Sequence, residues 1–135
     1  MKRFTDTEIW DREWYMSLAP YLKCLMRYMF DKCDASGVWS PNWKLASVYI
    51  GSEVSEADLE KIPADQWEIV DGKVFLPGFI PFQYGELSEK CVPHKAVIKL
   101  LAKNKIKERV SVGYAKDKPG LTDEPAKGRL RVAEG

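Results

Sequence analysis

The hydrophobic positions in the first quarter of the chain repeat with the period of an α-helix. They recur at steps of four, three and four residues, which places them on one face of an amphipathic helix. These positions are Leu18, Leu22, Leu25 and Met29. Pro20 suits the first turn of this helix, and the stretch 34–37 (Asp-Ala-Ser-Gly) breaks it after about Cys33.

Capping signals place one helix before this one and another after it. Thr5-x-x-Glu8 matches a capping box and predicts a short helix that starts near Asp6. Val38-Trp39 has the character of a short strand. Ser40-Pro41 predicts an N-cap followed by a first-turn proline, and Gly51 ends the third helix.

A β-hairpin is the clearest local signal in the chain. Before it, Ser55-x-x-Asp58 caps a fourth, short helix that stops ahead of Pro63. The runs Trp67–Val70 and Lys73–Leu76 then alternate between apolar and polar residues, and Asp71-Gly72 joins them. Two such runs around an Asp-Gly pair predict a tight hairpin.

The segment after the hairpin divides into an aromatic stretch and a basic helix. The aromatic stretch, which we expect to be extended, contains Phe79, Pro81, Phe82 and Tyr84. A fifth helix is predicted from Pro93 to Lys103. Its core positions would be Val97, Leu100 and Leu101, and its solvent face a lysine stripe at spacing four, Lys95, Lys99 and Lys103.

This order of elements predicts the fold class. Helices closed by a hairpin form an α+β domain of the winged helix-turn-helix type, a helical core with a small β-hairpin wing. We assign residues 1–110 to this domain. Large apolar residues are few beyond Ser111, so residues 111–135 are expected to form a flexible C-terminal tail.

Composition narrows the class of protein. Of the 135 residues, 45% are hydrophobic and 30% charged, as in soluble globular proteins, which argues against global disorder. No apolar run approaches the ~18–20 residues that span a membrane, and the start of the chain lacks a secretory signal. Three cysteines without a C-x-x-C pair predict a reduced, cytoplasmic protein.

Charge is divided unevenly along the chain. Residues 1–66 hold 8 Lys/Arg and 11 Asp/Glu, a net charge of −3, whereas residues 67–135 hold 13 and 9, a net charge of +4. Residues 90–109 alone combine seven basic residues with Glu108, a local charge of +6. Such a segment is a candidate anion-binding surface, although many charge runs only face solvent.

A series of short motifs, in order, resembles the N-terminal winged-helix domain of phage-type replication initiators, also called replisome organisers. The motifs span about residues 3–106. They are Phe4-Thr5, Trp10-Asp11, Trp14, Leu18, Lys23, Tyr28, Gly37-Val38-Trp39, Trp43-Lys44-Leu45-Ala46, Ile50-Gly51, Phe79-Ile80, Phe82-Gln83-Tyr84-Gly85 and His94-Lys95. The resemblance implies a module that binds DNA at a replication origin, with replication proteins as further partners.

The fourth helix, which would enter the DNA major groove in such a fold, is acidic. Glu53, Glu56, Asp58 and Glu60 stand there against Lys61 alone. Carboxylates repel phosphate, so we expect DNA to contact a more basic surface. The candidate DNA-binding residues are Lys44, Lys73, Gln83, Tyr84, Lys90, His94, Lys95, Lys99 and Lys103. Gln83 would add a polar contact and Tyr84 a stacking contact. The alternative for Tyr84 is that its ring packs in the hydrophobic core.

Two chemical alternatives have weaker support. Cys91-x-x-His94 has the spacing of metal ligands, and Cys33 or Cys24 could complete a zinc site, but only one such pair is present. An enzyme would need a nucleophile, a base and an orienting group, and the single histidine, His94, has no evident carboxylate partner. No nucleotide-binding or hydrolase motif occurs. We therefore expect no catalytic residues, metal or cofactor.

A third alternative is a winged-helix module that binds a protein in a replication or regulatory assembly, without direct DNA contact. The near-neutral net charge of +1 and the acidic fourth helix favour it. A homodimer is compatible with either interpretation, because many helix-turn-helix proteins bind paired half-sites.

Overall fold

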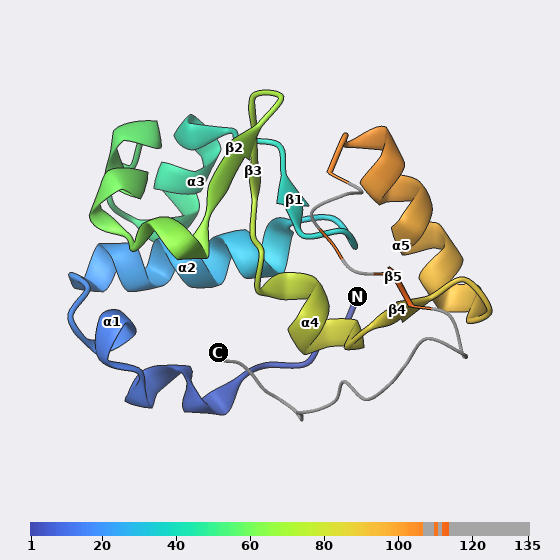
Figure 1. The fold of residues 1–135 in the computed structure, drawn as a ribbon. Helices are drawn as coiled ribbons and strands as arrows, with labels where there is room; N and C mark the ends of the chain where they lie inside the picture. Colours follow the sequence, from blue (N-terminus) through green and yellow to red (C-terminus); the bar gives the residue numbers. More distant parts are fainter. Residues whose placement is uncertain (107–109, 111, 114–135) are drawn as a thin grey trace.

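A computed structural model describes residues 1–106, 110, 112 and 113 of the chain (Figure 1). In chain order its elements are η1 (Thr7–Asp11), α1 (Glu13–Met16), α2 (Pro20–Lys32), β1 (Val38–Trp39), α3 (Trp43–Ile50), η2 (Glu56–Lys61), η3 (Ala64–Gln66), β2 (Glu68–Val70), β3 (Lys73–Phe75), α4 (Phe79–Tyr84), β4 (Leu87–Ser88), α5 (Val92–Lys103) and β5 (Val112–Gly113), where η marks a 3₁₀-helix. The fold is α+β, as the order of sequence signals predicts.

The helix α2 is the centre of the hydrophobic core. Its apolar positions Leu22, Leu25 and Met29 are buried at the predicted spacing, and Pro20 stands in its first turn. Tyr15 of α1 packs its ring edge-on against Trp14, and its hydroxyl donates to the Lys23 carbonyl at 3.2 Å. The helix α2 ends within a residue of the predicted end at Cys33, whereas Leu18, the first position of the predicted repeat, lies before the N-cap Ala19.

Three short strands form an antiparallel sheet in the order β1-β3-β2. Val38 pairs with Phe75 and Ile69 pairs with Val74, so β3 lies in the middle. Asp71 and Gly72 have φ values of 54° and 76°, the positive pair that a type I′ turn requires. The predicted hairpin is confirmed, and the side chain of Val74 in its second strand is fully buried.

The start of α3 differs from the prediction. Asn42, rather than Ser40, caps the helix, since its Oδ1 accepts the Leu45 N–H at 3.0 Å. Pro41 therefore precedes the cap instead of standing in the first turn. Gly51 ends the helix as predicted, with a φ of 84° in the left-handed region that glycine tolerates.

The predicted fourth helix is present as the 3₁₀-helix η2. Ser55 and Asp58 form the predicted capping box, and the Ser55 N–H donates to Asp58 at 2.9 Å. The Tyr21 hydroxyl on α2 donates to the same carboxylate at 3.1 Å, and the Lys61 ammonium donates to it at 3.2 Å. Asp58 therefore ties η2 to the central helix.

The predicted extended stretch after the hairpin is wrong, because Phe79–Tyr84 folds as the helix α4. Its Phe79 and Ile80 side chains are both buried. Phe79 packs against Gly37, where a Cβ would lie only 2.9 Å from the Phe79 Cβ. This tertiary contact, which the local sequence does not reveal, favours the helical turn.

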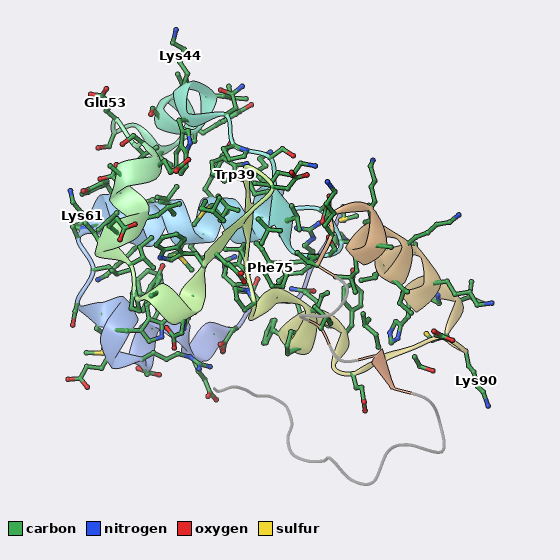
Figure 2. The ribbon with its side chains drawn as sticks, turned by 45° about the horizontal axis from the view of Figure 1, so that its top comes forward. Trp39, Lys44, Glu53, Lys61, Phe75 and Lys90 are labelled. Atoms are coloured by element: carbon green, nitrogen blue, oxygen red, sulfur yellow. The ribbon has the colours of Figure 1, made fainter. Side chains whose placement is uncertain are left out.

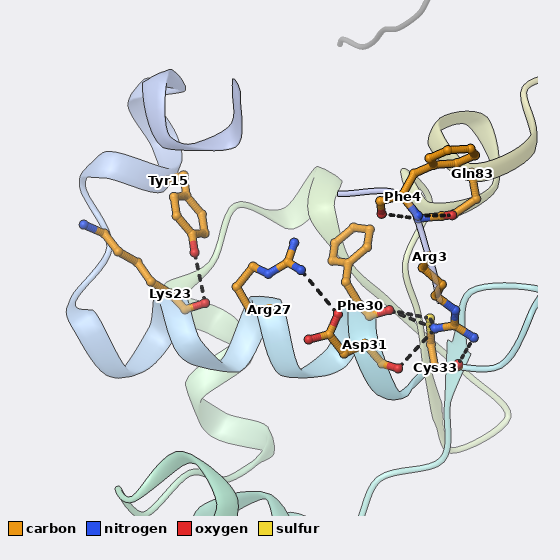
Figure 3. A network of polar contacts seen from close by, with 9 residues as sticks. All are labelled: Arg3, Phe4, Tyr15, Lys23, Arg27, Phe30, Asp31, Cys33 and Gln83. Carbon is orange, nitrogen blue, oxygen red and sulfur yellow. Dashed lines mark hydrogen bonds and ion pairs between the residues drawn. The ribbon is translucent and has the colours of Figure 1, made fainter. Parts of the chain in front are cut away.

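The N-terminal segment lies between the C-terminal end of α2 and the helix α4, and polar contacts hold it to both (Figure 3). The Arg3 guanidinium donates to the carbonyls of Phe30 at 2.9 Å and Cys33 at 2.7 Å, which satisfies the C-terminal end of α2. The same group lies 4.9 Å from the centre of the Phe79 ring. Burial raises the pKa of the neighbouring Cys33 thiol to about 12, although the Arg3 charge opposes that shift.

Beyond α4 the chain forms a second, two-stranded sheet that the sequence does not predict. Leu87 of β4 pairs in parallel with Val112 of β5. These β5 residues fall within the predicted tail, and the rest of that tail, residues 111 and 114–135, lies outside the described residues. Over the described part of the chain, no helix has the length and apolar character needed to cross a membrane.

Replacing Asp58 with Ala is expected to lower the free energy of unfolding by about 1–2 kcal/mol near pH 7, because it removes the capping box and the Tyr21 contact. Burial alone would raise the pKa of Asp58, but its hydrogen bonds outweigh burial and lower the pKa below 3.8. The carboxylate therefore stabilises the fold above that pH and loses this effect as the pH falls.

Urea unfolding of Asp58→Ala at pH 7 and near pH 3 measures both effects. The exposed neighbour Glu60 provides a control, since Glu60→Ala should stay within roughly 0.5 kcal/mol of the parent. An equal loss for Asp58→Ala at the two pH values would contradict this account.

Candidate nucleic-acid interface

The outward face of α5 carries a row of lysines. Val97 and Leu101 are buried, whereas Lys95, Lys99 and Lys103 are exposed on the other side of the helix. At a rise of 1.5 Å per residue, successive lysines of this row are about 6 Å apart along the axis. The predicted lysine stripe is confirmed as a solvent-facing row, and Figure 2 shows Lys90 projecting from the same end of the molecule.

This end of the molecule has little opposing charge. The stretch from Lys90 to Ile106 contains five lysines and no carboxylate side chain. None of the ion pairs between described residues involves Lys90, Lys95, Lys99 or Lys103. Glu86 and Glu89, which precede the stretch, have interactions of their own. The lysines of α5 are therefore available to an external anion.

Asn104, directly after α5, fixes the position of the helix. Its side chain is buried, and its Nδ2 donates to Asp34 Oδ2 and to Ser36 Oγ, both at 3.1 Å. Lys73 of the hairpin donates to Asn104 Oδ1 at 3.4 Å. We call this group of four side chains the Asn104 junction; it joins α5, the turn after α2 and the hairpin.

Asp34 is the carboxylate at the centre of the Asn104 junction. Its Oδ1 accepts the Ser36 N–H at 2.8 Å, the Ser36 hydroxyl at 2.6 Å and the Val38 N–H at 3.1 Å. These bonds hold the turn that leads from α2 into β1. Because Asn104 binds the other oxygen of the same carboxylate, the turn and the end of α5 are set by one group.

The chain leaves α5 through a left-handed residue. Lys105 has a φ of 64°, and the N–H of Ile106 donates to Leu101 O at 3.0 Å, the closure that normally has glycine at this position. The Lys105 ammonium lies 3.8 Å from the Asp71 carboxylate at the tip of the hairpin. Lys105 thus extends the lysine row to the tip of the hairpin. Its place just after a helix C-cap is the sequence signal for it.

Lys73, a predicted DNA contact, has a structural role. It is half-buried and directs its ammonium to Asn104 rather than away from the molecule. Lys73 lies beside the end of α5, as a DNA contact near that helix would, but its ammonium is used within the Asn104 junction.

Gln83 and Tyr84 of α4 also serve the fold. The Gln83 amide accepts the Phe4 N–H at 3.1 Å and donates to the Phe4 carbonyl at 2.8 Å, so both of its polar atoms are used (Figure 3). Tyr84 is half-buried, and its ring meets the Phe79 ring edge-on at 6.4 Å. Burial raises the pKa of Tyr84, and the charge of Arg3 opposes this shift without cancelling it. Neither side chain joins the exposed row on α5.

His94 lies in the first turn of α5, where it closes the connection from β4. Its Nδ1 accepts the Ser88 N–H at 3.1 Å, and its ring meets Tyr84 edge-on at 5.7 Å. In the neutral ring, an accepting Nδ1 leaves the proton on Nε2. The His94 ring is half-buried, which leaves it partly accessible beside the lysine row.

Lys44 is separated from the other predicted contacts. It projects from α3 at the end of the molecule away from Lys90 (Figure 2). Glu53, Glu56 and Glu60, all exposed, follow α3 in the sequence. Of the predicted DNA contacts, Lys44 therefore lies alone near an acidic part of the surface, whereas the lysines of α5 lie together at the opposite, basic end (Figure 2).

The residues considered for zinc do not form a metal site. All three cysteines are free thiols, Cys33 is buried against Arg3, and the Nδ1 of His94 is occupied by Ser88. Within the described ranges there is no group of three or more His, Cys, Asp or Glu side chains able to hold a metal ion.

Comparison of the chain with family models, with curated proteins and with solved structures gives no match.

Asn104→Ala is expected to lower the free energy of unfolding by about 1–3 kcal/mol, because Asp34, Ser36 and Lys73 each lose a partner at a buried position. Thermal and urea unfolding measure this loss. Lys103→Ala, on the exposed face one residue earlier, should change stability by less than about 0.5 kcal/mol. Similar stabilities for the two variants would show that the junction does not hold α5.

Proposed function

We propose that this protein is a winged-helix module that binds DNA through the α5 basic face, which we define as Lys90, Lys95, Lys99, Lys103 and Lys105. The observation that carries the proposal is the exposed lysine row on a helix without acidic side chains. DNA binding of this kind depends mainly on neutralising phosphates with Lys and Arg.

The arrangement of the elements supports the winged-helix part of the proposal. The helix α2 precedes β1, α3 and η2 lie between β1 and β2, and the sheet order is β1-β3-β2 with a tight hairpin at its edge. A winged helix has this order, with the helix before the hairpin as the usual reading helix. Here that helix is η2, of only six residues, with exposed Glu56 and Glu60.

The acidic η2 therefore makes the usual major-groove contact unfavourable, and α5 is the better surface by charge. From Lys95 to Lys103 the row is about 12 Å long, the axial length over which one DNA strand presents three to four phosphates. Contacts of this type position a protein on DNA without reading sequence. We expect binding with a strong dependence on salt and a weak dependence on sequence.

The motif order that resembles phage-type replication initiators agrees with this activity. In that role the module would hold DNA at a replication origin. The replication proteins that act there would be its further partners.

Fluorescence anisotropy with a labelled duplex, from roughly 50 to 200 mM salt, tests the proposal. The variant Lys95→Gln/Lys99→Gln/Lys103→Gln should bind at least about ten-fold more weakly at low salt. The slope of log K against log salt should fall by about three, because each lysine contributes close to one released counterion.

A matched control removes three positive charges elsewhere, on residues outside both α5 and the α3 face, as Lys2→Gln/Lys23→Gln/Arg27→Gln. It should bind nearly as the parent does, with an unchanged salt slope. If both triple variants lose affinity equally, net charge rather than the α5 basic face controls binding. If the parent does not bind at low salt, the proposal fails, and a protein-binding module becomes the favoured function because α3 exposes apolar side chains.

A further inference from the structure

Among the described elements, α3 carries the largest number of exposed large apolar side chains, and they lie on its outer face. Leu45, Val48 and Tyr49 are 45%, 73% and 64% exposed, and their spacing of three and four places them on one face of the helix. The opposite face faces the core through the fully buried Ala46. Single exposed apolar residues are ordinary, but three on one helical face indicate a contact surface.

The charges at the ends of α3 are opposite to those that its own dipole favours. Lys44 stands in the first turn, and Glu53 follows the C-terminal end. A helix favours negative charge near its N-terminus and positive charge near its C-terminus. Both side chains are exposed, and they carry no ion pair with another described residue. Figure 2 shows both at the same end of the molecule.

We propose that this surface binds a second copy of the chain, with the two α3 helices packed antiparallel about a two-fold axis. In that arrangement the N-terminal end of one α3 lies beside the C-terminal end of the other. Lys44 of each copy then meets Glu53 of the other copy. Each of these charges also comes to lie at the helix terminus of the other copy that favours it.

The apolar residues match the same symmetry. With the two-fold axis between residues 48 and 49, Val48 of one copy faces Tyr49 of the other, and Leu45 faces the small Ser52. A surface that binds its own copy must be self-complementary in this way. Lys32, whose ammonium lies 5.5 Å from the Tyr49 ring centre, is at the edge of the patch.

The position of the patch also suits a second copy. The α3 and α5 helices lie on different sides of the hairpin (Figure 1), so pairing through α3 leaves both α5 helices at the outer ends of the dimer. Bringing the two lysine-rich faces together would oppose association, and this arrangement keeps them apart. The contact is smaller than the ~20 residues a side of stable complexes, so we expect a weak, reversible dimer.

Sedimentation velocity of the full chain, over a concentration series up to roughly 1 mM and without DNA, tests the inference. The parent should show a monomer–dimer equilibrium, and Val48→Glu should stay monomeric at every concentration. Because Val48 is mainly exposed, this variant should keep the parent's circular dichroism and thermal midpoint. Lys99→Glu, an exposed charge change on α5, should dimerise at least as well as the parent.

Charge reversal tests the two-fold pairing itself. Lys44→Glu alone and Glu53→Lys alone should each associate about ten-fold more weakly, because each places like charges at both contacts. An equimolar mixture of these two variants should associate as the parent does, since every contact in the mixed dimer joins opposite charges.

Three outcomes would overturn the inference. They are a parent that remains monomeric throughout, association that Val48→Glu leaves unchanged, and a mixture that associates no better than its components. If the parent is monomeric, the exposed apolar face of α3 would instead be a contact surface for a different protein. None of these results depends on DNA binding, so the failure of this inference and the failure of the proposed function are separate.

Discussion

The C-terminal end of α5 is held in place by one half-buried polar group, the carboxylate of Asp34. One of its oxygens holds the turn between α2 and β1, and the other accepts from Asn104 at the end of α5. A half-buried carboxylate is costly unless its hydrogen bonds are satisfied, so the turn and the helix end stabilise each other. Lys73 supplies positive charge on the hairpin side of Asn104. Burial of Val97 and Leu101 turns the lysine row toward solvent, and the Asp34 carboxylate fixes the C-terminal end of the same helix through Asn104.

The elements with strong local signals could be predicted from the sequence. The spacing of Leu22, Leu25 and Met29 is sufficient to define α2, and Asp71-Gly72 defines the hairpin because a type I′ turn needs those residues. The lysine spacing likewise predicts the exposed face of α5. The helix α4 could not be predicted, because its aromatic residues suit a strand, and the close packing of Phe79 on Gly37 is a tertiary contact that local sequence does not show.

The positive charge of the candidate site could be predicted from the sequence, but the set of residues that form it could not. Exposed lysines at spacing four need only helical geometry, whereas the roles of Lys73 and Gln83 depend on residues 31 and 79 positions away in sequence. A polar side chain in a sequence has the same appearance whether it faces solvent or bonds a distant backbone. The structure assigns Gln83 to the N-terminal segment and Lys73 to the Asn104 junction, and it adds Lys105, which the left-handed end of α5 carries toward Asp71.

The separation of the two proposed surfaces has a physical consequence for their combined action. Positive faces repel each other, so a contact between two copies forms most readily where it keeps the α5 helices apart. A patch of three apolar residues is too small to hold a dimer at low concentration. Because the α5 helices lie at the outer ends of the α3-paired dimer, each copy would bind a separate segment of DNA. Two segments that lie close together raise the effective concentration of one copy for the other, and a weak α3 contact then becomes sufficient. Weak self-association and non-specific phosphate binding would in this way reinforce each other on DNA while leaving the free protein largely monomeric.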